Sequence, residues 1–134
     1  MTKYANVQSA VFSVFTGVWT TEGVKTFPQD SVISAGIEEF LRVSIVASGP
    51  GLNFKSVSGV ILVEIFTPSG KGPNRATVLA DKLDIYLSGK TFTDGSGNAT
   101  QLFSSGLVNN GLDADNPRLA RSTFSIPFNY YGKQ

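Results

Sequence analysis

The sequence predicts an α+β domain in which a mostly antiparallel β-sheet packs against two α-helices. Two segments repeat apolar residues at the 3.6-residue period of a helix, and three others alternate apolar and polar side chains as strands do. The chain has 134 residues, of which 41% are hydrophobic, and this size suits one hydrophobic core. We therefore treat residues 1–134 as a single domain, and its elements follow in chain order.

The first predicted helix covers residues 4–19. One apolar stripe on it consists of four valines, Val7, Val11, Val14 and Val18. A second stripe beside it consists of aromatic residues, Phe12, Phe15 and Trp19. Together they cover about half of the helix circumference, which is wide for one face. Either the domain clasps this helix deeply, or a neighbouring subunit covers the aromatic stripe; we expect the second arrangement.

Residues 20–37 lose periodicity and are predicted to be a loop, and residues 38–47 then alternate as a half-buried strand. Its inward side chains are Leu41, Val43, Ile45 and Ala47. Turn-forming residues follow, so we expect residues 47–55 to be a loop that is mobile in the isolated subunit and orders on assembly. The residues that favour this mobility are Gly49, Pro50 and Gly51.

The most strongly predicted strand covers residues 56–67 and carries apolar side chains on both faces, which indicates a central strand covered on both sides. After a turn rich in glycine and proline, the second helix begins, with Asn74 as its expected N-cap and Gly89 just beyond its end. Its buried stripe is predicted to be Ala76, Leu79, Ala80, Leu83 and Leu87.

The last third of the chain is predicted to be mostly strands. Residues 91–93 and 101–103 read as short strands around a turn at 94–98, and residues 109–117 read as a polar loop. Residues 118–131 read as a closing strand. Pro127 within it fits a sheet edge or a strand end, because proline cannot donate a ladder hydrogen bond.

Composition excludes most familiar catalysts. The chain has no Cys and no His, which removes thiolate nucleophiles, disulfides and the commonest metal ligand. Its net charge of +1 gives no strong attraction to nucleic acid or to an acidic membrane. The apolar run at 60–66 contains Glu64 and is too short to span a bilayer, and the run at 10–19 lacks a signal-peptide cleavage site. We expect a non-enzymatic, soluble protein without cofactor or metal.

Three short motifs resemble functional sites but are better interpreted as ordinary turns or solvated surface. The turn containing Lys71 lies between a strand and a helix, but it lacks the glycine and hydroxyl spacing of a phosphate-binding loop. Asp113 and Asp115 have the spacing of the first two ligands in a calcium-binding loop. Phe124, however, occupies the position of the glutamate that closes such a loop. Asp81 and Asp84 lie three residues apart on the second helix and are read as a solvated face.

Residues 59–83 resemble the tail-terminator, or tail-completion, proteins of long non-contractile phages of the lambda type. The shared pattern is a glycine-led apolar strand, GVILVEIFTP, a Pro-x-Gly-x-Gly turn, and a helix carrying Leu-Ala-Asp. The order of the flanking elements agrees over nearly the whole chain.

The resemblance implies a virion protein, assembled in the host cytoplasm, that caps the tail tube and ends its polymerisation. It also implies a hexameric ring of identical subunits, which contacts the tail tube protein and a head-completion or connector protein and lets genomic DNA pass without specific binding. A closed ring needs two different patches on each subunit. Lys71 and Arg75, beside the glycine turn, are expected to lie at an intersubunit or lumen surface.

Two alternatives remain open. One is another virion assembly protein, such as a head-tail connector or neck component. The other is a nonviral β-rich ligand-binding module, whose natural contacts would be aromatic side chains. Those side chains are Trp19, Tyr86, Tyr130 and Tyr131.

Overall fold

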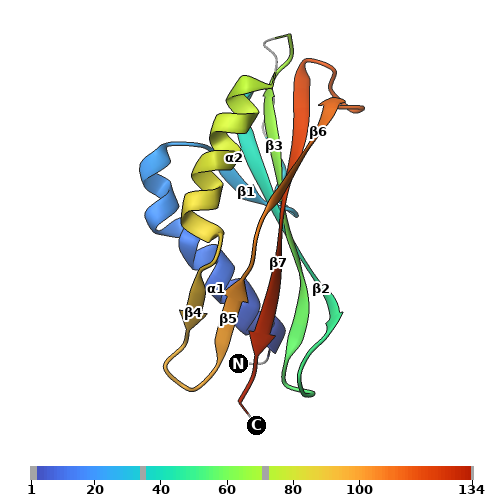
Figure 1. Ribbon diagram of the computed structural model, residues 1–134. Coiled ribbons are helices and arrows are strands. Elements are labelled where there is room, and N and C mark those ends of the chain that lie inside the picture. The colour runs from blue at the N-terminus through green and yellow to red at the C-terminus, as the bar shows by residue number, and fades with distance from the viewer. Residues whose placement is uncertain (1–2, 34–35, 71–72, 134) are drawn as a thin grey trace.

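A twisted seven-stranded sheet carries both α-helices on one face in the computed structural model, which describes residues 3–33, 36–70 and 73–133 (Figure 1). The helical elements are α1 (Lys3–Thr16), the 3₁₀ helix η1 (Val18–Glu22) and α2 (Asn74–Leu87). The strands are β1 (Thr26–Pro28), β2 (Phe40–Pro50), β3 (Val57–Pro68), β4 (Thr91–Thr93), β5 (Ala99–Leu102), β6 (Gly106–Leu112) and β7 (Leu119–Tyr131). The predicted α+β class is confirmed at this level.

The strands run in the order β1-β2-β3-β7-β5-β4, and β6 pairs with β7 off this path. The pair β1–β2 is parallel, and the other five pairs are antiparallel. β5 and β6 share one edge of β7, because β5 pairs with residues 128–131 and β6 with residues 120–125. Both ends of the chain and the β2–β3 hairpin lie at the same end of the molecule (Figure 1).

The main core lies between the helices and the inner face of the sheet. The predicted stripe of α2 is buried, as are the inward residues of β3 and β7 that oppose it. The fully buried strand residues include Leu41, Ile61, Val63, Ile65 and Ile126. Burying each such side chain contributes about 1.5–3 kcal/mol, so alternation on the long strands selects which face receives the helices.

The outer face of β3 is covered only at one end. Phe66 stacks on Phe40 with ring centroids 4.5 Å apart, and Leu119 completes this second, smaller cluster. Val60 and Leu62 farther along the same face remain partly exposed. The expectation that β3 is covered on both faces is therefore right only beside Phe66.

The first α-helix is shorter than predicted. α1 ends at Thr16, and the tighter 3₁₀ turn that follows changes the direction of the next side chains. Val18 consequently leaves the valine stripe and is 59% exposed, whereas Trp19 turns inward and is buried. The four-residue spacing from Val14 to Val18 was misread as continuing one helix.

Strand β2 runs three residues farther than predicted. Gly49 pairs with Ser58 and Pro50 pairs with Val57, after a bulge that follows Val46. The prediction that these residues belong to a mobile loop is therefore wrong for Gly49 and Pro50. A bulge accommodates the turn-forming residues within the strand, and the connection begins only at Gly51.

Two strands were missed and one was misplaced. β1 lies in the predicted loop at 20–37, and β6 begins before the predicted loop at 109–117 and includes residues 109–112 of it. β7 is central, not an edge, since it lies between β3 on one side and β5 and β6 on the other. Pro127 has no N–H to donate, and it is tolerated in this central strand because it faces the gap between β5 and β6. The carbonyl of Phe103 in that gap accepts the backbone N–H of Gly89 rather than one from residue 127.

Residues 91–93 form a strand as predicted, whereas the next short strand covers residues 99–102 rather than 101–103. Gly89 adopts a left-handed conformation with φ of 71° just after α2, as a helix-terminating glycine does. Asn74 is the first helical residue rather than the N-cap, a position that Pro73 occupies without a side-chain cap.

Candidate assembly surfaces

The predicted aromatic interface is mostly internal. Phe15 and Trp19 are buried within the single chain, and Trp19 packs edge-to-face on Tyr86 with ring centroids 5.4 Å apart. The indole N–H of Trp19 also donates to the Thr26 hydroxyl at 2.9 Å. The prediction that a neighbouring subunit covers this stripe is wrong for Phe15 and Trp19, because α2 and η1 already do so. Phe12 is only partly buried and remains available.

A polar cluster fastens η1 to α2 beside this aromatic group. Tyr86 donates its hydroxyl proton to Glu22 at 2.7 Å, and Lys82 lies 3.1 Å from the other carboxylate oxygen. These two contacts, the tyrosine bond first, hold the pKa of Glu22 below its usual value. The cluster is used internally, and it explains why Tyr86 is not a free ligand contact.

Of the two cationic residues predicted at a surface beside the glycine turn, the structure describes one. Lys71 lies outside the described residues. Arg75 makes a two-pronged ion pair with Glu39, at 2.7 and 3.2 Å, which ties the first turn of α2 to the residue before β2. This bond raises the pKa of Arg75. Arg75 is 43% exposed in its side chain, so its other face remains accessible.

The acidic motifs serve local structure. Asp84 accepts from Ser105 and Ser88, which lowers its pKa and links α2 to the β5–β6 connection. A carboxylate oxygen of Asp113 accepts the backbone N–H of Asn116 at 3.1 Å, closing a turn.

Over the described ranges, no group of three or more His, Cys, Asp or Glu residues could hold a metal ion. Likewise, no helix in those ranges is long and apolar enough to cross a membrane.

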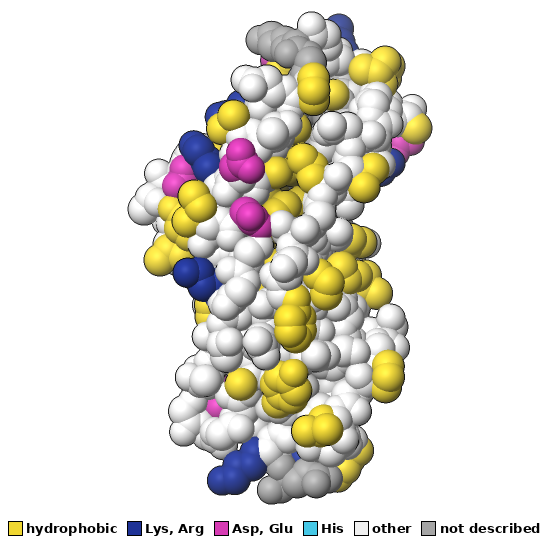
Figure 2. Space-filling view, in the orientation of Figure 1, with side chains coloured by type: hydrophobic (Ala, Val, Ile, Leu, Met, Phe, Trp, Pro, Cys, Tyr) yellow, Lys and Arg dark blue, Asp and Glu magenta, His cyan; other side chains and the backbone are white. Residues whose placement is uncertain are grey.

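Besides the three-residue strands β1 and β4 that end the strand order, two longer open edges lie on opposite sides of the sheet. The first is β6, whose seven residues are all exposed and which pairs only with β7 among the described strands. It contains no charged residue and no proline, the usual features that prevent edge pairing. Apolar side chains reach the surface on the side of the molecule where β6 and β7 lie (Figure 2). We call this strand the β6 edge.

The second open edge belongs to β2. β1 pairs with Leu41, Arg42 and Val43 only, so residues 44–50 have no partner strand on that side among the described residues. These seven residues also carry no charge, although Pro50 ends them. Phe12 lines a hollow of about 280 Å³ beside Ser44 and Ile45. We call residues 44–50 the β2 edge.

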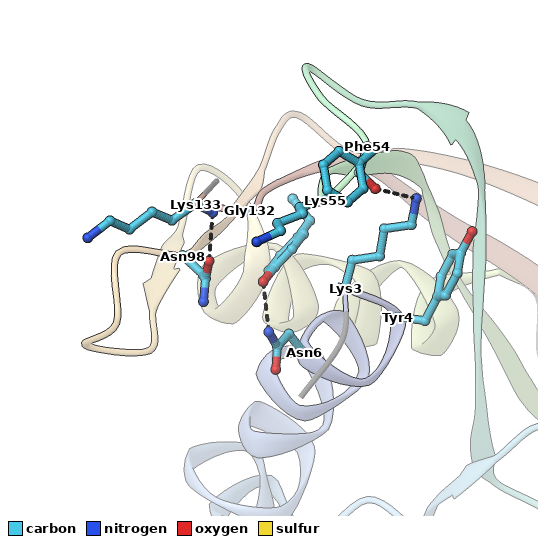
Figure 3. Close-up of a pocket in the computed structure, with 9 residues that line it drawn as sticks. Lys3, Tyr4, Asn6, Phe54, Lys55, Asn98, Gly132 and Lys133 are labelled. Carbon is cyan, nitrogen blue, oxygen red and sulfur yellow. Dashed lines mark hydrogen bonds between the residues drawn. The ribbon is translucent and has the colours of Figure 1, made fainter.

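A basic groove opens at the end of the molecule that holds both chain ends (Figure 3). It has a volume of about 550 Å³ and lies between the start of α1, the β2–β3 turn and the residues after β7. Its lining residues are Lys3, Tyr4, Asn6, Phe54, Lys55, Asn98, Tyr130, Gly132 and Lys133. Sequence reasoning missed this groove because its three lysines are far apart in the chain.

Comparisons with known proteins identify the fold alone. No family model matches the chain, and no curated protein sequence matches it. One solved structure superposes with a TM-score of 0.69, covering 96% of this chain and 95% of the other at 15% sequence identity. This likeness shows that another protein of about the same length shares the fold, and a shared fold does not fix a function.

Proposed function

We propose that the protein is a structural component of a phage tail that caps the tail tube, ends its polymerisation and forms the surface to which the filled head joins. In this proposal six copies form a closed ring in the virion, with DNA passing through the centre. The observation that carries it is the pair of different, uncharged sheet edges on opposite sides of the sheet.

Two unlike patches on one subunit are what a closed head-to-tail ring requires. Pairing the β6 edge of one subunit with the β2 edge of the next would satisfy backbone groups that are otherwise left to water. Each edge also has a hollow beside it. Phe12 lines the one at the β2 edge, and a hollow of about 390 Å³ lies between β6 and the start of α2. Side chains of a neighbour have room to enter both.

The segment that resembles the tail-terminator family contributes one strand and one helix to the described structure. Its strand is β3 and its helix is α2, so the motif lies at the centre of the sheet and in the main core. The alternative of a β-rich ligand-binding module loses three of its four suggested contacts, because Trp19 and Tyr130 are buried and the Tyr86 hydroxyl is bound to Glu22. The charge balance and the lack of a catalytic constellation suit an assembly role.

The test is mass in solution, with and without purified tail tubes from the phage that carries the gene. We expect the wild-type protein to add to tube ends and to form hexamers there or alone, measured by size-exclusion chromatography with light scattering and by electron microscopy. Val108→Lys places a charge on the β6 edge at a side chain that is already exposed, and it should abolish ring formation. Val32→Lys, at an exposed loop position, is the control. A wild-type protein that stays monomeric and ignores tube ends contradicts the proposal.

A further inference from the structure

The basic groove has the chemistry of a peptide-binding site, and we propose that it binds an extended acidic segment of a partner protein. The inference rests on its charge, its aromatic walls and its fixed shape. It concerns a single subunit and does not depend on the ring proposed above.

The groove holds a local excess of positive charge. Three of its nine lining residues are Lys3, Lys55 and Lys133, and none is Asp or Glu. No carboxylate among the described residues lies within 4 Å of these three ammonium groups, whereas Arg75, Lys82 and Arg121 each have an acidic partner. The whole chain carries a net charge of only +1, so the groove is more positive than the chain on average. Several acidic side chains lie instead over α2, away from this end (Figure 2).

The acid closest in sequence to the lining is already engaged. Asp94 lines the neighbouring hollow with Asn98, and its carboxylate accepts from the Asn98 side chain at 2.7 Å and from the backbone N–H of Ser96 at 2.8 Å. These bonds, the one from the Asn98 side chain first, lower the pKa of Asp94. It does not supply a counter-ion to the three lysines.

The walls combine apolar rings with polar groups. Phe54 is 75% exposed and Tyr4 is 56% exposed, and the ammonium groups of Lys55 and Lys3 lie 5.8 and 5.2 Å from the centroids of these rings. The Asn6 and Asn98 side chains line the same space. The side-chain oxygen of Asn6 accepts no hydrogen bond within the described residues, so it can accept one from a peptide backbone. An acidic segment that also carries apolar side chains matches both features, with carboxylates on the lysines and apolar groups on the rings.

The groove is held in shape by contacts between distant parts of the chain (Figure 3). Asn6 donates to the Tyr130 hydroxyl at 2.7 Å, and the Lys3 ammonium donates to the Phe54 carbonyl at 3.1 Å. The backbone N–H of Lys133 donates to Asn98 at 2.8 Å. In the close-up, the Lys55 ammonium points into the hollow, while that of Lys133 extends outward along its rim. A preformed site loses less entropy on binding a flexible peptide.

The shape favours a peptide over duplex DNA. A DNA duplex is too wide to enter a hollow of about 550 Å³, whereas an extended peptide can lie in it. Single-stranded nucleic acid also stacks on aromatic rings, so it enters the test as a competing outcome.

The probe is a fluorescein-labelled peptide of alternating glutamate and leucine, titrated at low salt with anisotropy as the signal. The matched peptide carries glutamine in place of glutamate. Lys55→Glu with Lys133→Glu reverses the groove, and Lys25→Glu with Lys90→Glu makes the same net change at exposed lysines outside it. We expect the groove variant to bind at least about tenfold more weakly than wild type and the control variant to retain most of the affinity. Added salt should weaken the wild-type complex.

Three results would overturn the inference. Equal weakening in both double variants would show that net charge alone matters. Equal binding of the glutamine peptide would show that the lysines are not used. Tighter binding of an oligothymidylate, with displacement of the peptide, would assign the groove to nucleic acid. Light scattering on the same samples reports oligomeric state separately, so a failed ring and a failed groove are distinguishable.

Discussion

At the scale of single residues, the closest packing constraint falls on Gly59 in β3. The bulge in β2 brings the Val46 carbonyl against this position, so that an added Cβ would overlap the carbonyl oxygen and lie 2.9 Å from the carbonyl carbon. β3 is paired with β2 on one side and with β7 on the other, so its backbone has little freedom to shift. We expect Gly59→Ala to lower the free energy of unfolding by roughly 2–3 kcal/mol.

Urea denaturation of that variant should be compared with Gly106→Ala. At Gly106 an added Cβ meets only the Ser125 hydroxyl at 3.7 Å, an ordinary contact, so the cost should stay within about 0.5 kcal/mol. Similar midpoints for the two variants would mean that the bulge can relax.

The aromatic residues of the first helical region give a second prediction. Phe15→Ala removes a buried ring and should lower the free energy of unfolding by about 3–5 kcal/mol. Phe12→Ala should cost only about 1 kcal/mol, because its ring is partly exposed, yet it should weaken association more. Thermal unfolding and sedimentation of both variants separate the two effects. Normal ring formation by Phe12→Ala would remove Phe12 from the interface.

At the scale of elements, the junction between α2 and β2 rests on the Arg75–Glu39 pair. Partly exposed pairs of this kind contribute about 0–1 kcal/mol, so Arg75→Glu should leave the monomer folded and slightly less stable. The exchange Glu39→Arg with Arg75→Glu should recover that stability in urea denaturation. If the single variant also fails to assemble and the exchange restores assembly, the pair acts within the subunit. Continued failure of the exchange would place Arg75 itself at the subunit interface.

The contacts of Glu22, which join η1 to α2, should make the stability of the protein depend on pH in the acid range. The pKa of Glu22 is lowered in the folded protein, so its contribution is complete above the unfolded value near 4.5 and is lost as pH falls through the folded pKa. We expect Glu22→Gln to reduce the difference in melting temperature between about pH 7 and about pH 3. Asp81→Asn is the control, since Asp81 is exposed and makes no hydrogen bond or ion pair in the described structure. An unchanged difference in Glu22→Gln contradicts the assignment.

The elements that the sequence predicts well are those with a long, unbroken period. α2, β3 and β7 each carry enough alternating or helical spacing to identify their buried face. β6 was missed because its residues are exposed and include Asn109, Asn110 and Gly111, which favour turns. The prediction that β7 lies at the sheet edge was wrong, because Pro127 is tolerated in this central strand through the gap between β5 and β6. Long-range features of this kind, including the basic groove, leave no local pattern.

At the scale of the whole molecule, the two open edges predict a directional interface. A head-to-tail ring uses the β6 edge of one subunit and the β2 edge of the next, so a defect in either edge stops closure. Val108→Lys should disable the β6 edge and Val46→Lys the β2 edge, since both side chains are exposed. Each variant alone should remain monomeric while keeping one sound edge.

Mixing the two variants distinguishes this geometry from a twofold dimer. The sound β2 edge of Val108→Lys can pair with the sound β6 edge of Val46→Lys, and the two remaining edges are both defective. The mixture should therefore form heterodimers and no larger ring, at twice the monomer mass by light scattering. An interface built from two β6 edges would instead let Val46→Lys form dimers alone, with no gain on mixing. Dimers in that single variant would contradict a head-to-tail ring and, with it, the arrangement on which tube capping is proposed.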